Sequence, residues 1–295
     1  MRLAVEVIAV FGPTGSGKTA VAEAIAQRLG TGVVSADAMQ VYRGLPILTN
    51  QPSRPSRLVA IREPWEEMSV GEYQGLAHEA IDELVAESGT AVVTGGTGLY
   101  LRAAIGGLDL PPAPQPGART RHEAAYDADP EAAHAMLRDR DPAAATVVHP
   151  NDRRRVVRAL ELAEAGASLA PEQNRLWAAE TRRRTLVIGL DVPPDVLRRR
   201  IEERTDAMFR AGVVEEVSAV LDSSAPSRTA AKALGLREVV ELAPDAAREA
   251  IVARTLRYAA YQRKWMRRIA GIVMIDADRP PEKAADAILE VARAR

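Results

Sequence analysis

The sequence predicts an α/β protein in which a parallel sheet is flanked by helices and carries a helical insertion. Apolar segments of strand length alternate with longer segments of helical periodicity, which is typical of a parallel sheet. A glycine-rich stretch, FGPTGSGKTA at residues 11–20, follows the first apolar segment and precedes the first helical one. Strand, glycine-rich loop and helix in this order indicate a P-loop NTPase-like fold.

The glycine-rich stretch matches the pattern G-x-x-x-x-G-K-[ST], whose glycines let backbone N–H groups surround a phosphate. In this pattern Lys18 neutralises the phosphates and the hydroxyl of Thr19 reaches Mg²⁺. The pattern recognises phosphates rather than a base, so the identity of the ligand stays open. We predict that its phosphates contact Gly12, Pro13, Thr14, Gly15, Ser16, Gly17, Lys18 and Thr19.

The other core elements follow from apolar segments and their periodicity. A buried strand is expected at residues 5–11 and an amphipathic helix at 19–29. Further strands are expected at 33–37, 90–96, 185–192 and 272–277, and further helices at 71–88, at 98–105 and from near Asp195. No internal repeat is present.

Two stretches rich in proline or serine, at 108–118 and 221–229, interrupt this pattern. Helical segments occupy most of the chain between the first stretch and the strand that begins at Thr185. The predicted domains are therefore an α/β core of residues 1–118 and 185–295 and a helical insertion of residues 119–184.

Composition limits the possible functions. The chain has 295 residues, which is enough for a full core, and no cysteine, which excludes disulfides, zinc–thiolate sites and cysteine nucleophiles. No apolar run is long enough to cross a bilayer, and the first residues lack the order of a signal peptide. We expect a cytoplasmic protein that acts as a monomer and does not bind membranes.

The net charge of −1 does not argue for or against nucleic acid, but arginines cluster at 151–158, 181–184, 197–200 and 254–268. The last cluster holds six basic residues and no acidic one, and Tyr and Trp lie among them. Arginine forks bind phosphates and aromatic rings stack on bases, so these clusters favour RNA. A coding bias toward arginine is an equal explanation for the overall arginine count.

Polar residues follow two predicted strands beside the glycine-rich loop. Asp37 ends the second strand, and GGTG at 95–98 ends the third. Ligands of parallel sheets bind at the carboxyl ends of strands, which makes both candidates for the site. Two alternatives stay open: Asp37 could hold Mg²⁺ as in a nucleoside triphosphatase, or Asp37 and Thr97 could only cap the turn and the helix that follow them.

Four segments in this order and spacing resemble the bacterial tRNA dimethylallyltransferase family: GPTGSGKT, SADAMQVYRGL, GGTGLYLRA and HPNDRRRVVRALE. The resemblance extends over nearly the whole chain, including RIEERTDAMFRAGVVEEV and the basic C-terminal helix with Gln262 and Trp265. It implies transfer of a five-carbon prenyl group from dimethylallyl diphosphate to the exocyclic amine of the adenine just 3′ of the anticodon. The loop is then expected to hold a prenyl diphosphate and not ATP.

The resemblance also assigns roles at the reacting centre. Asp37 is the candidate general base, because adenine's amine attacks carbon well only if it loses a proton as the bond forms. Lys18, the loop amides and Mg²⁺ held through Thr19 are expected to stabilise the leaving diphosphate, and Thr97 to hydrogen-bond near the reacting atoms. Arg204 is a further candidate for the diphosphate, although an ion pair with Glu202 or Glu203 explains it equally well.

RNA contacts are implied for two other segments. In the family, the segment matching Asp37, Ala38, Met39 and Gln40 meets the target base, as does Thr97 in the motif beside it. The segment matching Arg154, Arg155, Val156, Val157 and Arg158 lies on the anticodon stem-loop, and Arg119 matches another tRNA-contacting position. A solvated basic helix face is the alternative for residues 154–158.

The chain departs from the family pattern in several places. GLPILTNQP at 44–52 replaces G-M-D-I-G-T-A-K-P, a usual histidine pair is absent from LVAIREPWEE at 58–67, and GLRE at 235–238 replaces G-Y-K-E. Leu256 and Tyr261 stand where arginines are common. These changes concern tRNA docking rather than the reaction. Prenylation of a free adenine nucleotide and a small-molecule kinase remain the alternative functions.

Overall fold

The computed structural model describes residues 3–108, 110, 115–170 and 180–294. The chain divides into two compact units, one formed by residues 1–107 and 177–295 and the other by residues 108–176. The sequence pattern places this division at 118/119 and 184/185 instead. Part of the proline-rich stretch at 108–118, residues 109 and 111–114, lies outside the described residues.

The core unit is built on a parallel sheet, as predicted. Its five strands within the described residues are β1 (Val7–Phe11), β2 (Val33–Ser35), β3 (Ala91–Gly95), β4 (Thr185–Asp191) and β5 (Val273–Asp276). They lie in the order β2-β3-β1-β4-β5, and every neighbouring pair is parallel. The central strands β1 and β3 are buried throughout, because helices cover both of their faces.

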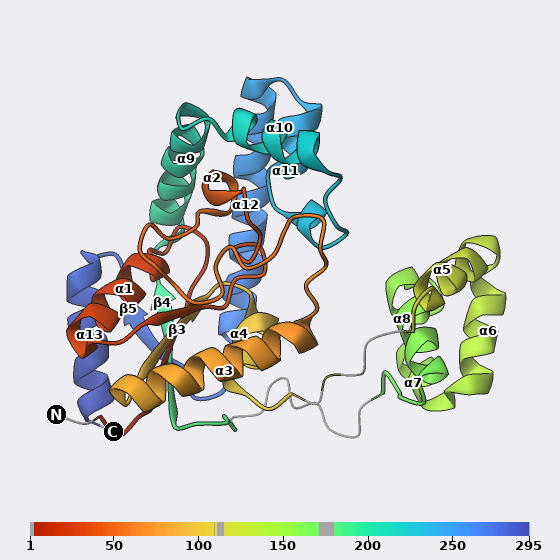
Figure 1. Cartoon of the computed structure of the whole chain (residues 1–295), viewed down its shortest axis with the longest axis horizontal. Helices are drawn as coiled ribbons and strands as arrows, with labels where there is room; N and C mark the ends of the chain where they lie inside the picture. The colour runs from red at the N-terminus through yellow and green to blue at the C-terminus, as the bar shows by residue number, and fades with distance from the viewer. Residues whose placement is uncertain (1–2, 109, 111–114, 171–179, 295) are drawn as a thin grey trace. The chain divides into compact units, whose positions relative to one another are not determined.

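Helices pack on both faces of this sheet (Figure 1). On one face, α1 (Lys18–Leu29) packs against α13 (Pro281–Arg293), and the apolar cluster there joins both helices to the sheet through residues such as Ile8, Ile25 and Ile288. On the other face, α3 (Val70–Ser88) packs against α4 (Gly98–Ile105). The fold therefore has three layers, as expected for an α/β core.

Further helices of the core unit lie beyond the carboxyl edge of the sheet, and the longest of them also extends down beside the sheet to α4 (Figure 1). They are α2 (Pro46–Thr49), α9 (Pro194–Arg210), α10 (Val213–Ser223), the 3₁₀ turn η2 (Ala230–Lys232), α11 (Leu236–Glu241) and α12 (Pro244–Met266). The longest, α12, packs along α9 and also contacts α4. This group of helices encloses the space above the strand ends.

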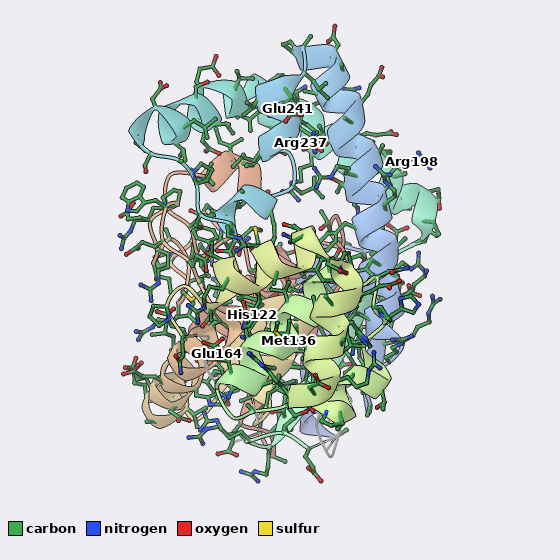
Figure 2. The ribbon with its side chains drawn as sticks, turned by 90° about the vertical axis from the view of Figure 1, so that its right-hand side faces the viewer. His122, Met136, Glu164, Arg198, Arg237 and Glu241 are labelled. Carbon is green, nitrogen blue, oxygen red and sulfur yellow. The ribbon has the colours of Figure 1, made fainter. Side chains whose placement is uncertain are left out.

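The second unit contains the helices α5 (Ala118–Ala128), α6 (Pro130–Arg140), α7 (Pro142–Val147) and α8 (Arg153–Glu164). It has its own apolar core, in which Leu137 and Leu160 are fully buried. His122 of α5 and Glu164 of α8 are joined across this helix pair by a 2.7 Å contact between Nε2 and Oε2 (Figure 2). Asp152 caps α8 by accepting a hydrogen bond from the N–H of Arg155.

No helix in the described part of the chain is long and apolar enough to span a membrane. The cytoplasmic location and the monomeric state stay predictions.

Candidate functional site

The sheet order brings three chain segments to one edge. β1 lies beside β3, and β3 lies beside β2, with Phe11 paired to Gly95 and Ser35 paired to Thr94. Because these parallel strands end at the same level, the residues that follow them meet there. The meeting segments are the phosphate loop (residues 12–19), Asp37 and the turn Gly96–Thr97.

The phosphate loop turns directly into α1, whose N-terminus favours anions. Gly15 and Gly17 have φ values of 86° and 80°, a conformation that other residues rarely adopt. Burial lowers the pKa of Lys18 to about 8; the nearby Asp37 carboxylate opposes this shift and Arg204 adds to it. The lysine thus has a positive charge at neutral pH in a place from which water is largely removed, and a bound phosphate would stabilise that charge.

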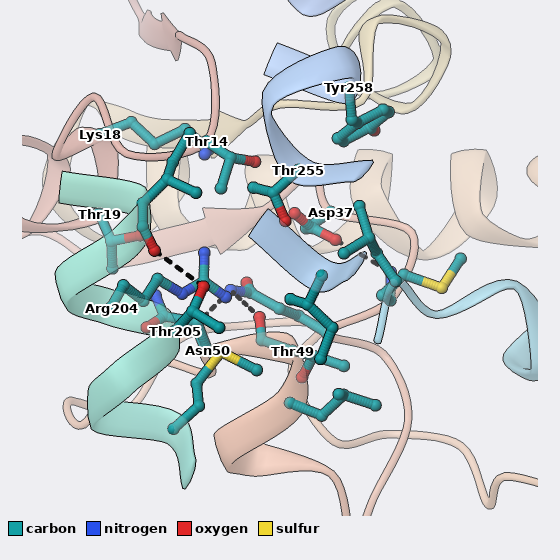
Figure 3. Close-up of a pocket in the computed structure, with 17 residues that line it drawn as sticks. Thr14, Lys18, Thr19, Asp37, Thr49, Asn50, Arg204, Thr205, Thr255 and Tyr258 are labelled. Carbon is teal, nitrogen blue, oxygen red and sulfur yellow. Dashed lines mark hydrogen bonds between the residues drawn. The ribbon is translucent and has the colours of Figure 1, made fainter. Parts of the chain in front are cut away.

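Arg204 reaches the same space from α9 (Figure 3). Burial lowers the pKa of this arginine, and Asp37 opposes the shift. Among the described residues its buried Nε has no hydrogen-bond partner, and no ion pair joins it to Glu202 or Glu203. A buried guanidinium without a carboxylate partner is available to an anionic ligand.

Asp37 stands just beyond β2. Its Oδ1 accepts a hydrogen bond of 2.9 Å from the N–H of Met39, so the carboxylate does stabilise the turn that follows, as the capping alternative requires. Its second oxygen accepts no hydrogen bond from the described residues, and the side chain lines the cavities described below. Capping thus engages only one oxygen of the Asp37 carboxylate.

Thr97 occupies the N-cap position of α4, but its side chain makes no capping hydrogen bond. Its Oγ1 instead lies 3.4 Å from the hydroxyl oxygen of Tyr258 on α12. The capping alternative for the Thr97 side chain is therefore not observed. Burial, and to a smaller extent Asp37, raises the pKa of Tyr258, so this phenol stays protonated and can donate.

Two cavities meet at these residues. The phosphate-loop cavity is lined by Thr14, Lys18, Thr19, Asp37, Met39, Gln40, Leu48, Thr49, Asn50, Ile201, Arg204, Thr205, Met208, Leu234, Ile251, Thr255 and Tyr258 (Figure 3). The adjoining cavity, of about 640 Å³, is lined by Asp37, Ala38, Met39, Thr97, Lys232, Leu234, Arg254, Arg257 and Tyr258. Asp37, Met39, Leu234 and Tyr258 line both, so the carboxylate stands on their common boundary.

Gln40 has a structural role that the sequence did not suggest. Its Oε1 accepts from the Ser35 hydroxyl at 2.8 Å, and its Nε2 donates to the carbonyl of Asn50 at 2.7 Å. The side chain thus fixes the path of the segment that follows Asp37. Ala38 and Met39, by contrast, line the adjoining cavity.

Helix α12 supplies residues whose position could not be read from sequence. Gln262 accepts a hydrogen bond from the N–H of Thr14 and donates one to the carbonyl of Gly96, each at 2.8 Å. It therefore ties the phosphate loop to the turn after β3. One turn further on, Trp265 packs so closely on Gly98 that a side chain there would overlap the indole. The last glycine of GGTG, Gly98, is needed for this contact.

The insertion gathers a second group of predicted residues. Arg119, Arg154, Arg155 and Arg158 line one concavity with Asp152 and Leu169. Arg119 and Arg158 both pair with the buried Glu161, at 2.5 and 3.0 Å, whereas Arg154 and Arg155 are exposed and have no ion pair among the described residues. Val156 and Val157 are buried in the core of the insertion, so their side chains pack rather than face a ligand.

The three-layer fold and the phosphate loop define a P-loop protein with a site for a phosphorylated ligand. Residues 40–269 match the model of the IPP transferase family, and the chain belongs to this family. A tRNA dimethylallyltransferase of Anaeromyxobacter dehalogenans is 40% identical over 94% of this chain and 97% of its own length. One from Streptomyces coelicolor is 40% identical over 89% of this chain and 87% of its own.

Solved structures agree with this assignment. The full-length tRNA isopentenylpyrophosphate transferase of Bacillus halodurans is 31% identical, with a TM-score of 0.69 over 97% of this chain and 95% of its own. A eukaryotic dimethylallyltransferase acting on tRNA is 24% identical with a TM-score of 0.75, over 93% of this chain and 74% of its own, which establishes similarity of fold.

The Lys18 pKa predicts a pH dependence of ligand binding. Below pH 8 the free protein carries the Lys18 ammonium, and above it the ammonium is lost, so affinity for inorganic diphosphate should fall about tenfold per pH unit there. Isothermal titration calorimetry across this range measures the effect. Lys18→Ala is the control, since its remaining pH dependence belongs to the ligand; parallel curves for the two proteins would contradict the prediction.

Proposed function

We propose that this protein transfers a dimethylallyl group from dimethylallyl diphosphate to the exocyclic amine of the adenosine just 3′ of the anticodon in tRNA, releasing diphosphate. Family membership supports this, as do relatives of that name that are 40% identical over most of the chain. The protein is thus a transferase of tRNA modification. The family match argues against a small-molecule kinase.

One observation carries the proposal: the Asp37 carboxylate stands between two cavities of different character. The phosphate-loop cavity has cationic groups at one end and apolar residues such as Leu48, Ile201 and Ile251 elsewhere in its wall. It suits a ligand with a diphosphate and a short hydrocarbon group. The adjoining cavity has the size of pockets that hold small organic ligands and basic residues in its wall, which suits a nucleotide of RNA.

The reaction follows from this arrangement. The adenine amine nitrogen attacks the first carbon of the prenyl group, the carbon–oxygen bond breaks, and diphosphate leaves with the electron pair. Asp37 accepts the proton that the nitrogen loses, through the oxygen not engaged by Met39. Thr97, beside Tyr258, is the hydrogen-bond partner for the adenine ring in the adjoining cavity.

Negative charge builds up on the leaving diphosphate as the carbon–oxygen bond breaks. The site must therefore provide positive charge that binds the diphosphate more strongly at that stage. Lys18, Arg204 and the N–H groups of the phosphate loop provide it in a space where screening by water is weak. The N–H of Thr14 is already used by Gln262 and that of Ser16 by the Pro13 carbonyl, so the other N–H groups of the loop carry this interaction.

Mg²⁺ fits these residues as a partner of the ligand rather than of the protein. In the described part of the chain no group of three His, Cys, Asp or Glu side chains could hold a metal, whereas the Thr19 hydroxyl lines the phosphate-loop cavity. Mg²⁺ prefers oxygen ligands and is commonly held by phosphates, water and few protein groups. When bound, it neutralises charge on the diphosphate, with Thr19 as its protein ligand.

The insertion presents a surface of its own that suits RNA. The exposed Arg154 and Arg155, with Arg158 and Arg119 in the same concavity, provide guanidinium groups for the phosphates of an anticodon stem-loop. Their hydrophobic neighbours Val156 and Val157 hold the helix that presents them.

The acceptor is tested by incubating the protein with Mg²⁺, labelled dimethylallyl diphosphate and either unmodified tRNA or AMP. We expect label on the tRNA adenosine and none on AMP. Label on AMP alone would mean that a free nucleotide is the substrate. Label on neither would overturn the proposal.

Asp37→Asn separates the two roles of this residue. The amide oxygen can still accept from Met39, so the turn is kept, but the group no longer takes a proton. Turnover should fall by about 10²- to 10⁴-fold while the Kd of inorganic diphosphate changes little. Both are measured on the same preparation by label transfer and calorimetry. Near-normal turnover would reduce Asp37 to a capping residue.

Arg154→Ala combined with Arg155→Ala tests the insertion. Removing these guanidinium groups should weaken tRNA binding and make the plot of log K against log salt shallower by about 1 for each phosphate that is no longer neutralised. The KM for dimethylallyl diphosphate should not change. Arg138→Ala is the matched control, because Arg138 is an exposed arginine of the insertion outside the concavity. An unchanged salt slope would remove these arginines from the RNA site.

A further inference from the structure

Two tyrosines of α12 form a stack that leads from the site to the surface. The Tyr258 ring lines both cavities, and the Tyr261 ring lies 6.4 Å from it between centroids, with 23° between the ring planes. This geometry is that of an offset stack. Tyr261 is 55% exposed, so one side of the stack is open to solvent.

The two rings belong to one stripe of the helix. Arg254, Arg257, Tyr258 and Tyr261 are spaced three or four residues apart, which places them on one face of α12. The first three line the adjoining cavity, and Tyr261, whose ring stacks on that of Tyr258, follows them toward the C-terminal end of the helix. The exposed ring therefore lies next to the proposed position of the target nucleotide.

The surroundings of this ring favour an anionic partner. No acidic residue occurs between Ala250 and Arg268. Arg254 pairs with Glu238, whereas the exposed Arg257 has no ion pair among the described residues. A flat aromatic face beside an unpaired guanidinium is the combination that binds a base and its phosphate together.

We propose that Tyr261 stacks on an unpaired base of the RNA next to the adenosine that enters the adjoining cavity. This rests on the proposed function. A base turned out of the loop leaves its neighbour with one face uncovered, and an aromatic ring can cover that face whatever the base. Tyr261 would thus position the RNA without touching the reacting atoms. An arginine at this position would also present a flat face that stacks on a base.

The first experiment measures kinetics with a synthetic anticodon stem-loop RNA. For Tyr261→Ala we expect the KM for RNA to rise about tenfold, with kcat and the KM for dimethylallyl diphosphate unchanged, because half-exposed stacking is at the lower end of the usual range. Tyr261→Phe and Tyr261→Arg should stay close to the parent protein. Met274→Ala is the control, because Met274 is a large side chain of β5 that is 45% exposed and lines neither cavity.

The second experiment does not depend on turnover. With 2-aminopurine beside the target adenosine, stacking on the ring should quench the fluorescence when the parent protein, Tyr261→Phe or Met274→Ala binds. Tyr261→Ala should quench it clearly less at saturation. Equal KM and equal quenching in Tyr261→Ala and the parent would overturn this inference while the proposed function stands. If the parent protein transfers no label to RNA, the proposed function and this inference fail together.

Discussion

The site depends on the electrostatic balance between a buried ammonium and a carboxylate at one sheet edge. Burial makes the Lys18 charge costly, and Asp37 offsets part of that cost. An anionic ligand would offset much more. The free protein thus holds an unsatisfied positive charge, increased by Arg204, in the cavity where a diphosphate fits. The same carboxylate that moderates this charge borders the second cavity, so one residue lies where both the anion and the proposed proton transfer require it.

This balance requires that β1, β2 and β3 end at the same edge of the sheet and that the loops after them have fixed positions. The register of β1, β2 and β3 provides the first condition. The second comes from polar side chains that bridge segments far apart in the sequence: Gln40 fixes the chain after Asp37, and Gln262 fixes the phosphate loop. Buried amides of this kind make two or more hydrogen bonds and so define one arrangement of the loops.

Local patterns in the sequence predicted the core well. The strands expected at 33–37, 90–96, 185–192 and 272–277 are all present, within two residues at each end, because each is a short apolar segment between turn residues. The strand order could not be predicted, since a parallel pairing leaves no mark in either strand alone. The short helix α2 was also missed: a single turn has no periodicity, and it depends on Glu216, whose carboxylate accepts from the N–H groups of Ile47 and Leu48.

The residues of the candidate site also divide into those that local motifs predict and those that depend on long-range contacts. The phosphate loop, Asp37 and Thr97 could be named from motifs at strand ends, whereas the contacts of Gln262 join residues 248 and 166 positions apart, beyond any local pattern. Residues 154–158 show that one role should not be assigned to every residue of a motif. The basic members are exposed or half-buried, but Val156 and Val157 are apolar neighbours on the inner side of the helix and are buried there. Helical periodicity alone indicates that division.

The hydrogen bonds of Gln262 affect how mutations in this enzyme should be interpreted. Its amide holds the phosphate loop through one atom and the turn before Thr97 through the other, and it belongs to the same helix as the tyrosine stack. A substitution of this glutamine is therefore expected to affect both the proposed donor site and the proposed RNA site, and not one of them alone. A single side chain thus connects the two segments that are proposed to contact the two substrates.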